Sequence, residues 1–346
     1  MRIAIVNDMP MAVEALRRAL AQNPVHKLAW IARSGAEAVA ACAADTPDLV
    51  LMDLIMPGMD GAEATRRIMA ASPCAILIVT ASVGANASRA YVAMSHGALD
   101  AVDTPDFAAA DPRRGTAALL AKIATIGRLI GDRDTRATAA GRHALAIPGG
   151  TKLLAIGASA GGPGALVTLL SGLGAHFRGA VVIVQHVDPQ FAPGMAEWLG
   201  QQAQLTVRIA REGDAPEPGT ALLASTADHL ALVAPNRLGY VADPVNYPYR
   251  PSVDVFFQSI CELWPGEAVG VLLTGMGRDG ALGLRALRNK GCHTIAQDAA
   301  TSAVYGMPKA AAALDAAVDI LPLDRIAPRL LRLFPDDRND ASGDTP

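Results

Sequence analysis

The sequence predicts an α/β protein with two domains, each built on a parallel sheet. Short apolar runs alternate with amphipathic stretches along most of the chain, which is the pattern of successive βα units. A single stretch near the middle, rich in glycine, proline and charged residues, interrupts this pattern. The length of 346 residues also fits two domains, because a domain has roughly 150 residues.

The N-terminal half is expected to form five βα units. The run Arg2–Val6 predicts a buried strand, because it is apolar after its first residue. The stretch Met11–Ala21 predicts a helix, because its apolar residues recur on one face. The other expected strands are Leu28–Ala32, Leu49–Met52, Ala75–Val79 and Ala101–Val102, and the other helices lie near 35–44, 62–71, 86–96 and 115–130. Together these units predict a doubly wound sheet over residues 1–126.

Residues 127–151 predict a linker, because large apolar residues are few after Ile130 while glycine, proline and charged residues are frequent. A second α/β series begins at Lys152 and predicts a second doubly wound domain over residues 152–335. Its expected strands are Leu153–Ile156, Ala180–Val184, Ala221–Ala224, Val269–Leu273, Thr294–Ala296 and Val318–Leu321. Residues 336–346 are polar and predict a flexible tail.

The composition excludes several classes of protein. Hydrophobic residues make up 51% of the chain and charged residues 18%, which is too apolar for a disordered protein. The net charge of -3 gives no electrostatic footprint for nucleic acid. No apolar run of about 18 residues predicts a membrane span, and the N-terminus reaches an acidic residue too early for a secretory signal. Four scattered cysteines without metal-ligand spacing are typical of a reduced, cytoplasmic protein.

Polar side chains follow three of the predicted N-terminal strands. Asp8 follows the first strand, Asp53 the third and Thr80 the fourth. Because the carboxyl ends of parallel strands meet at one edge of a sheet, we expect these side chains to converge. Asp8 and Asp53 can share a Mg2+ ion, which binds carboxylate oxygens and water. A metal there would also neutralise charge during phosphoryl transfer to Asp53.

This pattern resembles the receiver domain of two-component response regulators, whose fold is a flavodoxin-like, five-stranded parallel sheet. The resemblance rests on Asp8, on Leu51-Met52-Asp53, on the turn Met-Pro-Gly-Met-Asp-Gly at 56–61, and on Thr80. It implies that a histidine kinase phosphorylates Asp53. It also implies that Thr80 moves to contact the phosphoryl group and that Asp8 binds Mg2+.

Two residues depart from the receiver pattern. Asn7 stands where receivers usually have a first acidic residue. Thr104 stands where they have a lysine before a proline, and a phosphoaspartate without that lysine loses a charged partner. The alternatives are a receiver that is switched by phosphorylation of Asp53 and a receiver-shaped domain that is not. Only five of the 30 basic residues are lysine, so a missing lysine at one position is by itself unremarkable.

The second domain opens with a glycine-rich segment, Gly157-Ala158-Ser159-Ala160-Gly161, between a predicted strand and a predicted helix. The G-x-S-x-G spacing permits a tight turn that exposes the serine hydroxyl. The N-terminus of the following helix would favour a developing oxyanion. Ser159 is therefore a candidate nucleophile. Glycine-rich loops of this kind also bind phosphate, so a site for a phosphorylated ligand at 157–164 is the alternative.

His186 is the candidate general base. It ends a second apolar strand and so lies at the same edge of the sheet as Ser159. His176 and His293 precede strands and are expected at the opposite edge. His229 lies in an expected hairpin, where a surface or structural role is predicted.

Asp279 is the candidate orienting acid. It follows another buried strand, in the segment Gly275-Met276-Gly277-Arg278-Asp279-Gly280. The three glycines allow sharp turns that direct Asp279 and the backbone N–H of Met276 inward. The alternative is that Asp279 serves only as the N-cap of a helix at 280–289.

Ser159, His186 and Asp279 together predict a Ser–His–Asp relay, in a chain order unlike that of α/β hydrolases. The motifs Gly-Ala-Ser-Ala-Gly-Gly, Val-Gln-His and Leu-Thr-Gly-Met-Gly-Arg-Asp-Gly resemble the catalytic domain of chemotaxis response-regulator methylesterases, the CheB family. With the receiver, this resemblance spans about residues 1–335. It implies that Ser159 is the nucleophile, His186 the general base and Asp279 the orienting acid, and that the Met276 N–H contributes to the oxyanion hole.

By the same resemblance, the chain is expected to be a carboxylic-ester hydrolase that acts on methylated glutamates of a chemoreceptor and deamidates receptor glutamines. It would need no cofactor for hydrolysis, and the unphosphorylated receiver would cover the active site. Ala160 departs from the family, which often has threonine there. The Val-Asn-Asp-Met-Pro start and the Val-Asp-Thr-Pro segment look more like the surface-sensing, Wsp-type branch. The alternative function is a regulatory phospho-acceptor that docks to a kinase or receptor with little catalytic role.

Overall fold

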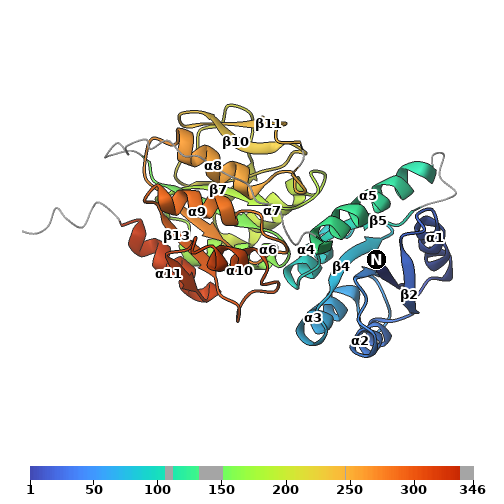
Figure 1. The fold of residues 1–346 in the computed structure, drawn as a ribbon. Helices are drawn as coiled ribbons and strands as arrows, with labels where there is room; N and C mark the ends of the chain where they lie inside the picture. Colours follow the sequence, from blue (N-terminus) through green and yellow to red (C-terminus); the bar gives the residue numbers. More distant parts are fainter. Residues whose placement is uncertain (106–111, 132–150, 246, 336–346) are drawn as a thin grey trace, which may run out of the picture.

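The computed structural model describes residues 1–105, 112–131, 151–245 and 247–335. Two α/β domains lie side by side, and two helices of the N-terminal domain face the C-terminal domain (Figure 1). These helices are α4 (Ala87–Ser95) and α5 (Pro112–Gly131). In the described ranges, no helix is both long enough and apolar enough to cross a bilayer.

The N-terminal domain is a five-stranded parallel sheet in the order β2-β1-β3-β4-β5. Its strands are β1 (Arg2–Val6), β2 (Lys27–Ala32), β3 (Leu49–Met52), β4 (Ala75–Thr80) and β5 (Asp100–Asp103). Its remaining helices are α1 (Pro10–Ala21), α2 (Gly35–Ala44) and α3 (Gly61–Ala71). The predicted receiver fold is therefore confirmed.

Both faces of this sheet are covered by helices, which explains why most of its strands read as continuous apolar runs. Successive side chains of a strand point to opposite faces. Ile3 and Ile5 accordingly pack in the core with α1 and α5, whereas Ala4 and Val6 pack in the core with α2, α3 and α4. Because β1 pairs with β3 and β3 with β4 in parallel, the carboxyl ends of these strands lie at one edge of the sheet.

The C-terminal domain has a seven-stranded sheet in the order β14-β13-β12-β6-β7-β9-β8, and among the described residues its neighbouring strands all pair in parallel. Its strands are β6 (Leu153–Ala158), β7 (Ala180–Gln185), β8 (Thr206–Ile209), β9 (Thr220–Leu223), β12 (Ala268–Leu272), β13 (His293–Gln297) and β14 (Asp319–Leu321). The predicted parallel sheet is confirmed. Strand β8 was not expected from the sequence, because it is a short edge strand without a buried apolar run.

Helices cover both faces of this second sheet (Figure 1). On one face lie α6 (Gly162–Leu173), α7 (Ala192–Ala203) and α11 (Leu323–Leu333), and on the other lie α8 (Val253–Leu263), α9 (Ala281–Asn289) and α10 (Met307–Ala313). The strand order reverses around β6, which has β7 on one side and β12 on the other. Ligands of open α/β sheets bind at such a reversal, and Ser159 follows β6 directly.

An antiparallel hairpin of β10 (His229–Ala234) and β11 (Arg237–Val241) packs on α8. In the N-terminal domain, α5 continues to Gly131, so the first five residues of the expected linker at 127–151 are helical. The rest of that segment that precedes residue 151, and the expected tail at 336–346, lie outside the described residues.

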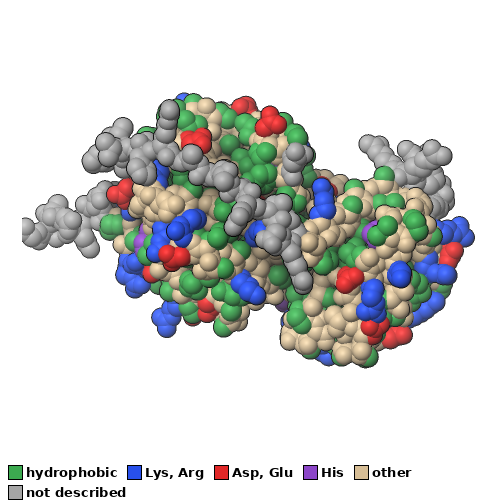
Figure 2. All heavy atoms as spheres, in the orientation of Figure 1, with side chains coloured by type: hydrophobic (Ala, Val, Ile, Leu, Met, Phe, Trp, Pro, Cys, Tyr) green, Lys and Arg blue, Asp and Glu red, His purple; other side chains and the backbone are tan. Residues whose placement is uncertain are grey.

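The two domains share one apolar core cluster along α4, α6 and α7. The Tyr91 hydroxyl on α4 donates to the Phe191 carbonyl at 2.8 Å, and the Gly161 N–H donates to the Met94 carbonyl at 2.9 Å. On the face drawn in Figure 2, the described acidic and basic side chains are interspersed over both domains. That distribution fits the small net charge of -3.

Candidate active site and acidic pocket

Ser159 is held in the turn between β6 and α6. Its backbone N–H donates to the Thr274 carbonyl at 3.0 Å, and its carbonyl accepts from the Gln185 side chain at 3.0 Å. Gly161 has a φ of 78°, a left-handed conformation that glycine adopts without strain. These contacts hold the serine side chain at the N-terminus of α6. The residue is only 3% exposed.

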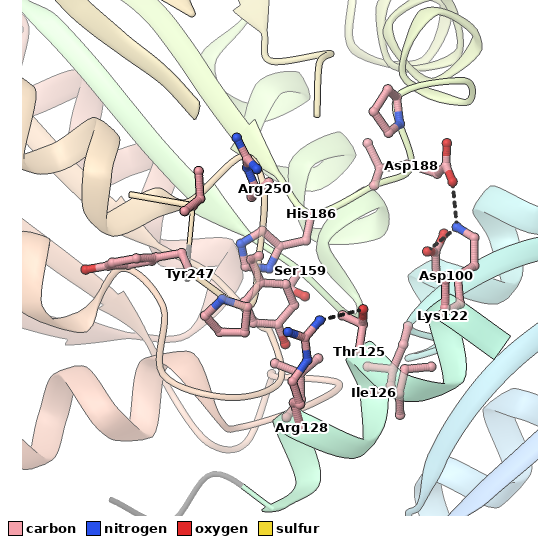
Figure 3. A pocket seen from close by; sticks show the side chains of 18 residues that line it. Asp100, Lys122, Thr125, Ile126, Arg128, Ser159, His186, Asp188, Tyr247 and Arg250 are labelled. Atoms are coloured by element: carbon pink, nitrogen blue, oxygen red, sulfur yellow. Dashed lines mark hydrogen bonds and ion pairs between the residues drawn. The ribbon is translucent and has the colours of Figure 1, made fainter. Parts of the chain in front are cut away.

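His186 follows β7 at the same edge of the sheet, as predicted. Its Nε2 lies 2.8 Å from Oδ2 of Asp279. Its Nδ1 is buried and has no hydrogen-bond partner among the described residues. Figure 3 shows Ser159 beside the imidazole. A carboxylate at Nε2 fixes the proton there, so Nδ1 carries the free lone pair that a base needs.

Tyr249 stacks on the His186 ring, with centroids 3.8 Å apart and an angle of 10° between the planes. Its hydroxyl donates to the Met276 carbonyl at 3.2 Å. The tyrosine therefore fixes the plane of the imidazole and connects it to the turn that carries Asp279. The predicted role of the Met276 N–H is not tested by these contacts and stays a prediction.

Asp279 accepts four hydrogen bonds. The donors are Nε2 of His186, the Ser252 hydroxyl and the backbone N–H groups of Val253 and Asp254, at 2.7 to 3.0 Å. Burial alone would raise the pKa of Asp279, but the bond and charge of His186 and the bonds from Ser252 and Val253 outweigh it, so the pKa is lowered. The carboxylate is therefore ionised at neutral pH.

Asp279 does not cap its own helix. The N-cap of α9 is Gly280, and no side chain caps it there. Asp279 instead accepts from the first turn of α8, while Asp254 in that turn accepts from the Gly283 N–H of α9 at 2.7 Å. The carboxylate of Asp279, just before α9, thus accepts from the first turn of α8, and the carboxylate of Asp254 in α8 accepts from the first turn of α9. The N-cap alternative for Asp279 is wrong, because the turn directs its carboxylate to α8. Burial and the charge of Asp279 raise the pKa of Asp254 to about 8.

His229 is completely buried, so a surface role for it is wrong. The hairpin that carries it packs on α8 instead of projecting into solvent. Its Nδ1 accepts from the Ser252 N–H at 3.0 Å, and its Nε2 lies 3.1 Å from the Pro244 carbonyl. These bonds support the other alternative, a structural role.

A cavity of about 380 Å³ lies between the two domains and contains Ser159 and His186 in its lining. The receiver contributes α5, including Thr125 and Arg128 (Figure 3). Ser159 and His186 therefore face a space that is partly closed by the receiver.

Lys122 of α5 bridges the domains beside this cavity. Its ammonium lies 2.5 Å from Asp100 of the receiver and 2.8 Å from Asp188 of the catalytic domain (Figure 3). Its side chain is 13% exposed. Burial alone would lower the pKa of Lys122, but the two carboxylates outweigh it and raise the pKa. The lysine is thus charged, and it joins the two domains by pairing with Asp100 of the receiver and Asp188 of the catalytic domain.

The structure also brings Asp53 to the expected edge of the receiver sheet. Nδ2 of Asn7 donates to Oδ2 of Asp53 at 3.0 Å, and the Ile55 N–H approaches Oδ1 at 3.4 Å. Thr80 is buried, and its hydroxyl lies 3.4 Å from Nδ2 of Asn86 instead of bonding Asp53. The Thr104 N–H donates to the Thr80 carbonyl at 2.8 Å.

The charges of the acidic pocket fit a divalent cation. Burial raises the pKa of Asp53 to about 6, the Ile55 and Leu54 N–H groups oppose this, and the charge of Asp8 adds to it. A cation would relieve this repulsion between carboxylates. Over the described ranges, no group of three His, Cys, Asp or Glu residues could hold a metal, but Mg2+ commonly binds through one or two carboxylates and keeps several waters. Asp8 and Asp53 meet that requirement.

Comparison with known proteins adds the decisive observation. The family model described as CheB methylesterase matches residues 154–330, which is half of the chain, and the model described as response regulator receiver domain matches residues 3–106. The chain belongs to the CheB methylesterase family. The resemblance inferred from the motifs is therefore confirmed at the level of the family.

Curated relatives of this CheB-family chain match along almost its whole length. Pseudomonas fluorescens protein-glutamate methylesterase/protein-glutamine glutaminase 1 is 60% identical over 97% of this chain and 100% of its own. Burkholderia lata protein-glutamate methylesterase/protein-glutamine glutaminase 1 is 62% identical over 96% of this chain and 99% of its own. The crystal structure of the Thermotoga maritima CheB methylesterase catalytic domain matches with a TM-score of 0.50 and 34% identity, over 53% of this chain and 99% of that one.

Several residues of this CheB-family site were missed in the sequence. Tyr249, Ser252 and Lys122 touch the relay or the cavity. None of them lies at the end of a predicted strand, so the rule that found Ser159 and His186 could not find them.

Proposed function

We propose that this chain is a protein-glutamate methylesterase that hydrolyses γ-methyl esters of glutamate on a chemoreceptor and deamidates receptor glutamines. The observation that carries the proposal is the orientation of His186. Its Nε2 is held by Asp279, its Nδ1 has no hydrogen-bond partner among the described residues, and its ring lies beside Ser159 (Figure 3). In this proposal Ser159 is the nucleophile, His186 the general base and Asp279 the orienting acid. No cofactor takes part in the hydrolysis.

In the first half of the reaction, Nδ1 of His186 takes the Ser159 proton while Oγ attacks the ester carbonyl. The imidazolium that forms lies between the Asp279 carboxylate and the Tyr249 ring, and both favour its positive charge. The tetrahedral intermediate then collapses, and His186 returns the proton to the departing methoxide, which leaves as methanol. Ser159 remains joined to the glutamyl group.

In the second half, water takes the place of methanol. His186 removes one proton from the water as it attacks the glutamyl ester, and the proton then passes to Oγ of Ser159. The products are free serine and a glutamate γ-carboxylic acid, which ionises. The backbone N–H of Met276 and the N-terminus of α6 are the proposed donors to the oxyanion in both halves. A glutamine side chain would follow the same path and release ammonia.

We infer that the receiver controls this activity through phosphorylation of Asp53 by a chemotaxis-type histidine kinase. Asp8 and Asp53 would hold Mg2+, and this ion would neutralise negative charge on the phosphoryl group during its transfer. Thr80 would then leave Asn86 and donate to the phosphoryl oxygen. The change would be transmitted along β4 and β5 to α4 and α5, which contact the catalytic domain.

The control of activity by Asp53 has a direct test. With acetyl phosphate or the cognate kinase, we expect methanol release from a methylated receptor to rise in the wild type and to stay at its basal rate in Asp53→Asn. The amide keeps the shape of the carboxylate but cannot accept the phosphoryl group. Equal stimulation of both proteins would show that the receiver does not switch through Asp53, which is the alternative raised by Thr104.

The Lys122 bridge predicts a constitutively active variant. Replacing Lys122 by methionine leaves Asp100 and Asp188 without their common cation, and removing one partner of a buried ion pair costs about 3–5 kcal/mol. The Lys122–Asp188 half of this bridge exists only while the domains are in contact. We therefore expect Lys122→Met to weaken the closed arrangement and to raise the unstimulated rate of methanol release about tenfold. Lys152→Met is the control, since Lys152 pairs with Glu267 within the catalytic domain. An unchanged rate in a folded Lys122→Met protein would refute the closed arrangement as an inhibitor.

The second candidate function, a regulatory docking protein with little catalytic role, is favoured only by Thr104. It predicts that Ser159→Ala keeps full pathway signalling while Asp53→Asn loses it. The methylesterase proposal predicts that both variants disturb adaptation of the pathway.

We further infer that the chain belongs to the surface-sensing, Wsp-type branch of the family. The support is the Val-Asn-Asp-Met-Pro start and the Val-Asp-Thr-Pro segment before residue 106. The proposed substrate lies on the cytoplasmic helices of a receptor, so we place the enzyme in the cytoplasm. Deletion of the gene should disturb adaptation to surface contact more than swimming chemotaxis.

A further inference from the structure

Ser252 lies at the start of α8 and is completely buried. Its hydroxyl donates to Oδ1 of Asp279 at 2.7 Å and accepts from the Val255 N–H at 3.4 Å. A hydroxyl at 2.7 Å from a carboxylate makes a strong, charge-assisted bond, whereas 3.4 Å is long for an N-cap bond. The main interaction of this hydroxyl is therefore with the orienting acid of the relay.

His229 fixes the position of Ser252. The Pro244 carbonyl is an acceptor only, so Nε2 of His229 must carry the proton, and Nδ1 must then accept from the Ser252 N–H. Burial lowers the pKa of His229, which keeps the ring neutral and favours this tautomer. The hairpin thus holds the backbone of Ser252 from one side while Asp279 receives its hydroxyl from the other.

We propose that Ser252 is a positioning residue for ester hydrolysis, held by His229, and that it extends the Ser159–His186–Asp279 relay by one hydrogen bond. The inference rests on the proposed esterase function. Ser252 reaches no substrate and no reacting atom. It acts through Asp279, whose orientation decides whether Nε2 of His186 is held in line with Oδ2.

The role follows from how the Asp279 carboxylate is anchored. Oδ2 accepts from His186 and the Val253 N–H, and Oδ1 accepts from Ser252 and the Asp254 N–H. The Ser252 hydroxyl and the Asp254 N–H thus hold Oδ1 from two directions. Without the hydroxyl, Oδ1 keeps one donor and the carboxylate gains freedom to rotate. Rotation misplaces Oδ2, and the imidazole follows it.

The chain provides a matched control on the same helix. Ser259 is also a buried serine of α8, and its hydroxyl bonds the Phe256 carbonyl and the Leu232 N–H instead of the relay. Ser259→Ala removes a comparable number of hydrogen bonds from a buried serine hydroxyl without touching Asp279. Ser252→Thr retains the hydroxyl and serves as the conservative rescue.

The experiment measures methanol release by the full-length chain from a methylated chemoreceptor, with kcat and KM determined separately. We expect Ser252→Ala to lower kcat about tenfold, equal to about 1.4 kcal/mol, with KM unchanged, and Ser252→Thr to recover most of the loss. Ser259→Ala should lower the melting temperature without changing kcat. Equal kcat in Ser252→Ala and Ser259→Ala would overturn the proposal.

A second measurement does not depend on enzymatic activity. The Nε2 proton of His186, bonded to a buried carboxylate, should give a resolved low-field signal in the proton NMR spectrum. We expect Ser252→Ala to shift or broaden that signal and Ser259→Ala to leave it in place. If the wild type released no methanol, the esterase proposal would fail while this signal still tested the position of Ser252. An unmoved signal in Ser252→Ala would refute the positioning role even in an active enzyme.

Discussion

Ser159→Ala is expected to lower methanol release from a methylated receptor by roughly 10⁶-fold, the scale of loss when a serine nucleophile is removed from a comparable relay. The variant keeps the backbone bonds of Ser159 to Thr274 and Gln185, so the loop and the substrate site should persist. We therefore expect receptor binding to be unchanged. The reason for the loss is chemical, because no other group replaces Oγ in forming the glutamyl ester.

The measurement is release of labelled methanol, with binding of the methylated receptor followed in parallel. Ser171→Ala is the control, since Ser171 lies on the helix that follows the nucleophile and its hydroxyl bonds the Gln202 carbonyl away from the site. Methanol release at the wild-type rate in Ser159→Ala would exclude the relay as the catalytic machinery. Loss of receptor binding together with activity would instead point to a folding defect.

The edge of each sheet at which polar residues gather could be predicted, because strand direction alone determines it. Once the apolar runs are recognised as parallel strands, every residue just after a strand lies at the same edge. That rule found Ser159, His186 and Asp53 without any knowledge of side-chain contacts. Asp279 required one more step, the recognition that the glycine-rich turn after β12 redirects the chain toward the site.

Contacts supplied by other elements could not be predicted in this way. Tyr249 and Ser252 come from the segment between β11 and α8, whose path is set by the packing of the hairpin on α8. The place of His229 in a hairpin predicts a surface or structural role, and the sequence does not show that the hairpin packs on α8 and encloses this residue. Lys122 lies in the other domain, and its partner Asp188 is 66 positions further along the chain.

The acidic pocket shows why the two receiver departures belong together. Replacing an acidic residue by Asn7 removes one negative charge, and replacing the lysine by Thr104 removes one positive charge, so the formal charge of the pocket is unchanged. Asn7 also provides an N–H donor to Asp53, which a carboxylate at that position could not do. The charge offset can be counted from the sequence alone, whereas the hydrogen bond from Asn7 to Asp53 is seen only in the structure.

Asp279→Asn tests the electrostatic part of the relay. An amide has one acceptor oxygen, while the carboxylate accepts from four donors on two oxygens. If the NH2 group takes the place of Oδ2, it faces Nε2 of His186 and forces the proton onto Nδ1, which removes the base. If it takes the place of Oδ1, it faces the Asp254 N–H, and that buried donor is left unpaired at a cost of about 1–3 kcal/mol.

In either orientation the imidazolium loses its carboxylate, so we expect Asp279→Asn to lower kcat by about 10⁴-fold, as the same change does in a serine protease. Asp254→Asn is the matched control, because the pKa of Asp254 is raised to about 8 and its neutral form at pH 7 resembles an amide. We expect that variant to lose less than about tenfold in kcat at pH 7. Equal losses in the two variants would mean that both acids act only by joining α8 to α9, and that the charge of Asp279 is not used.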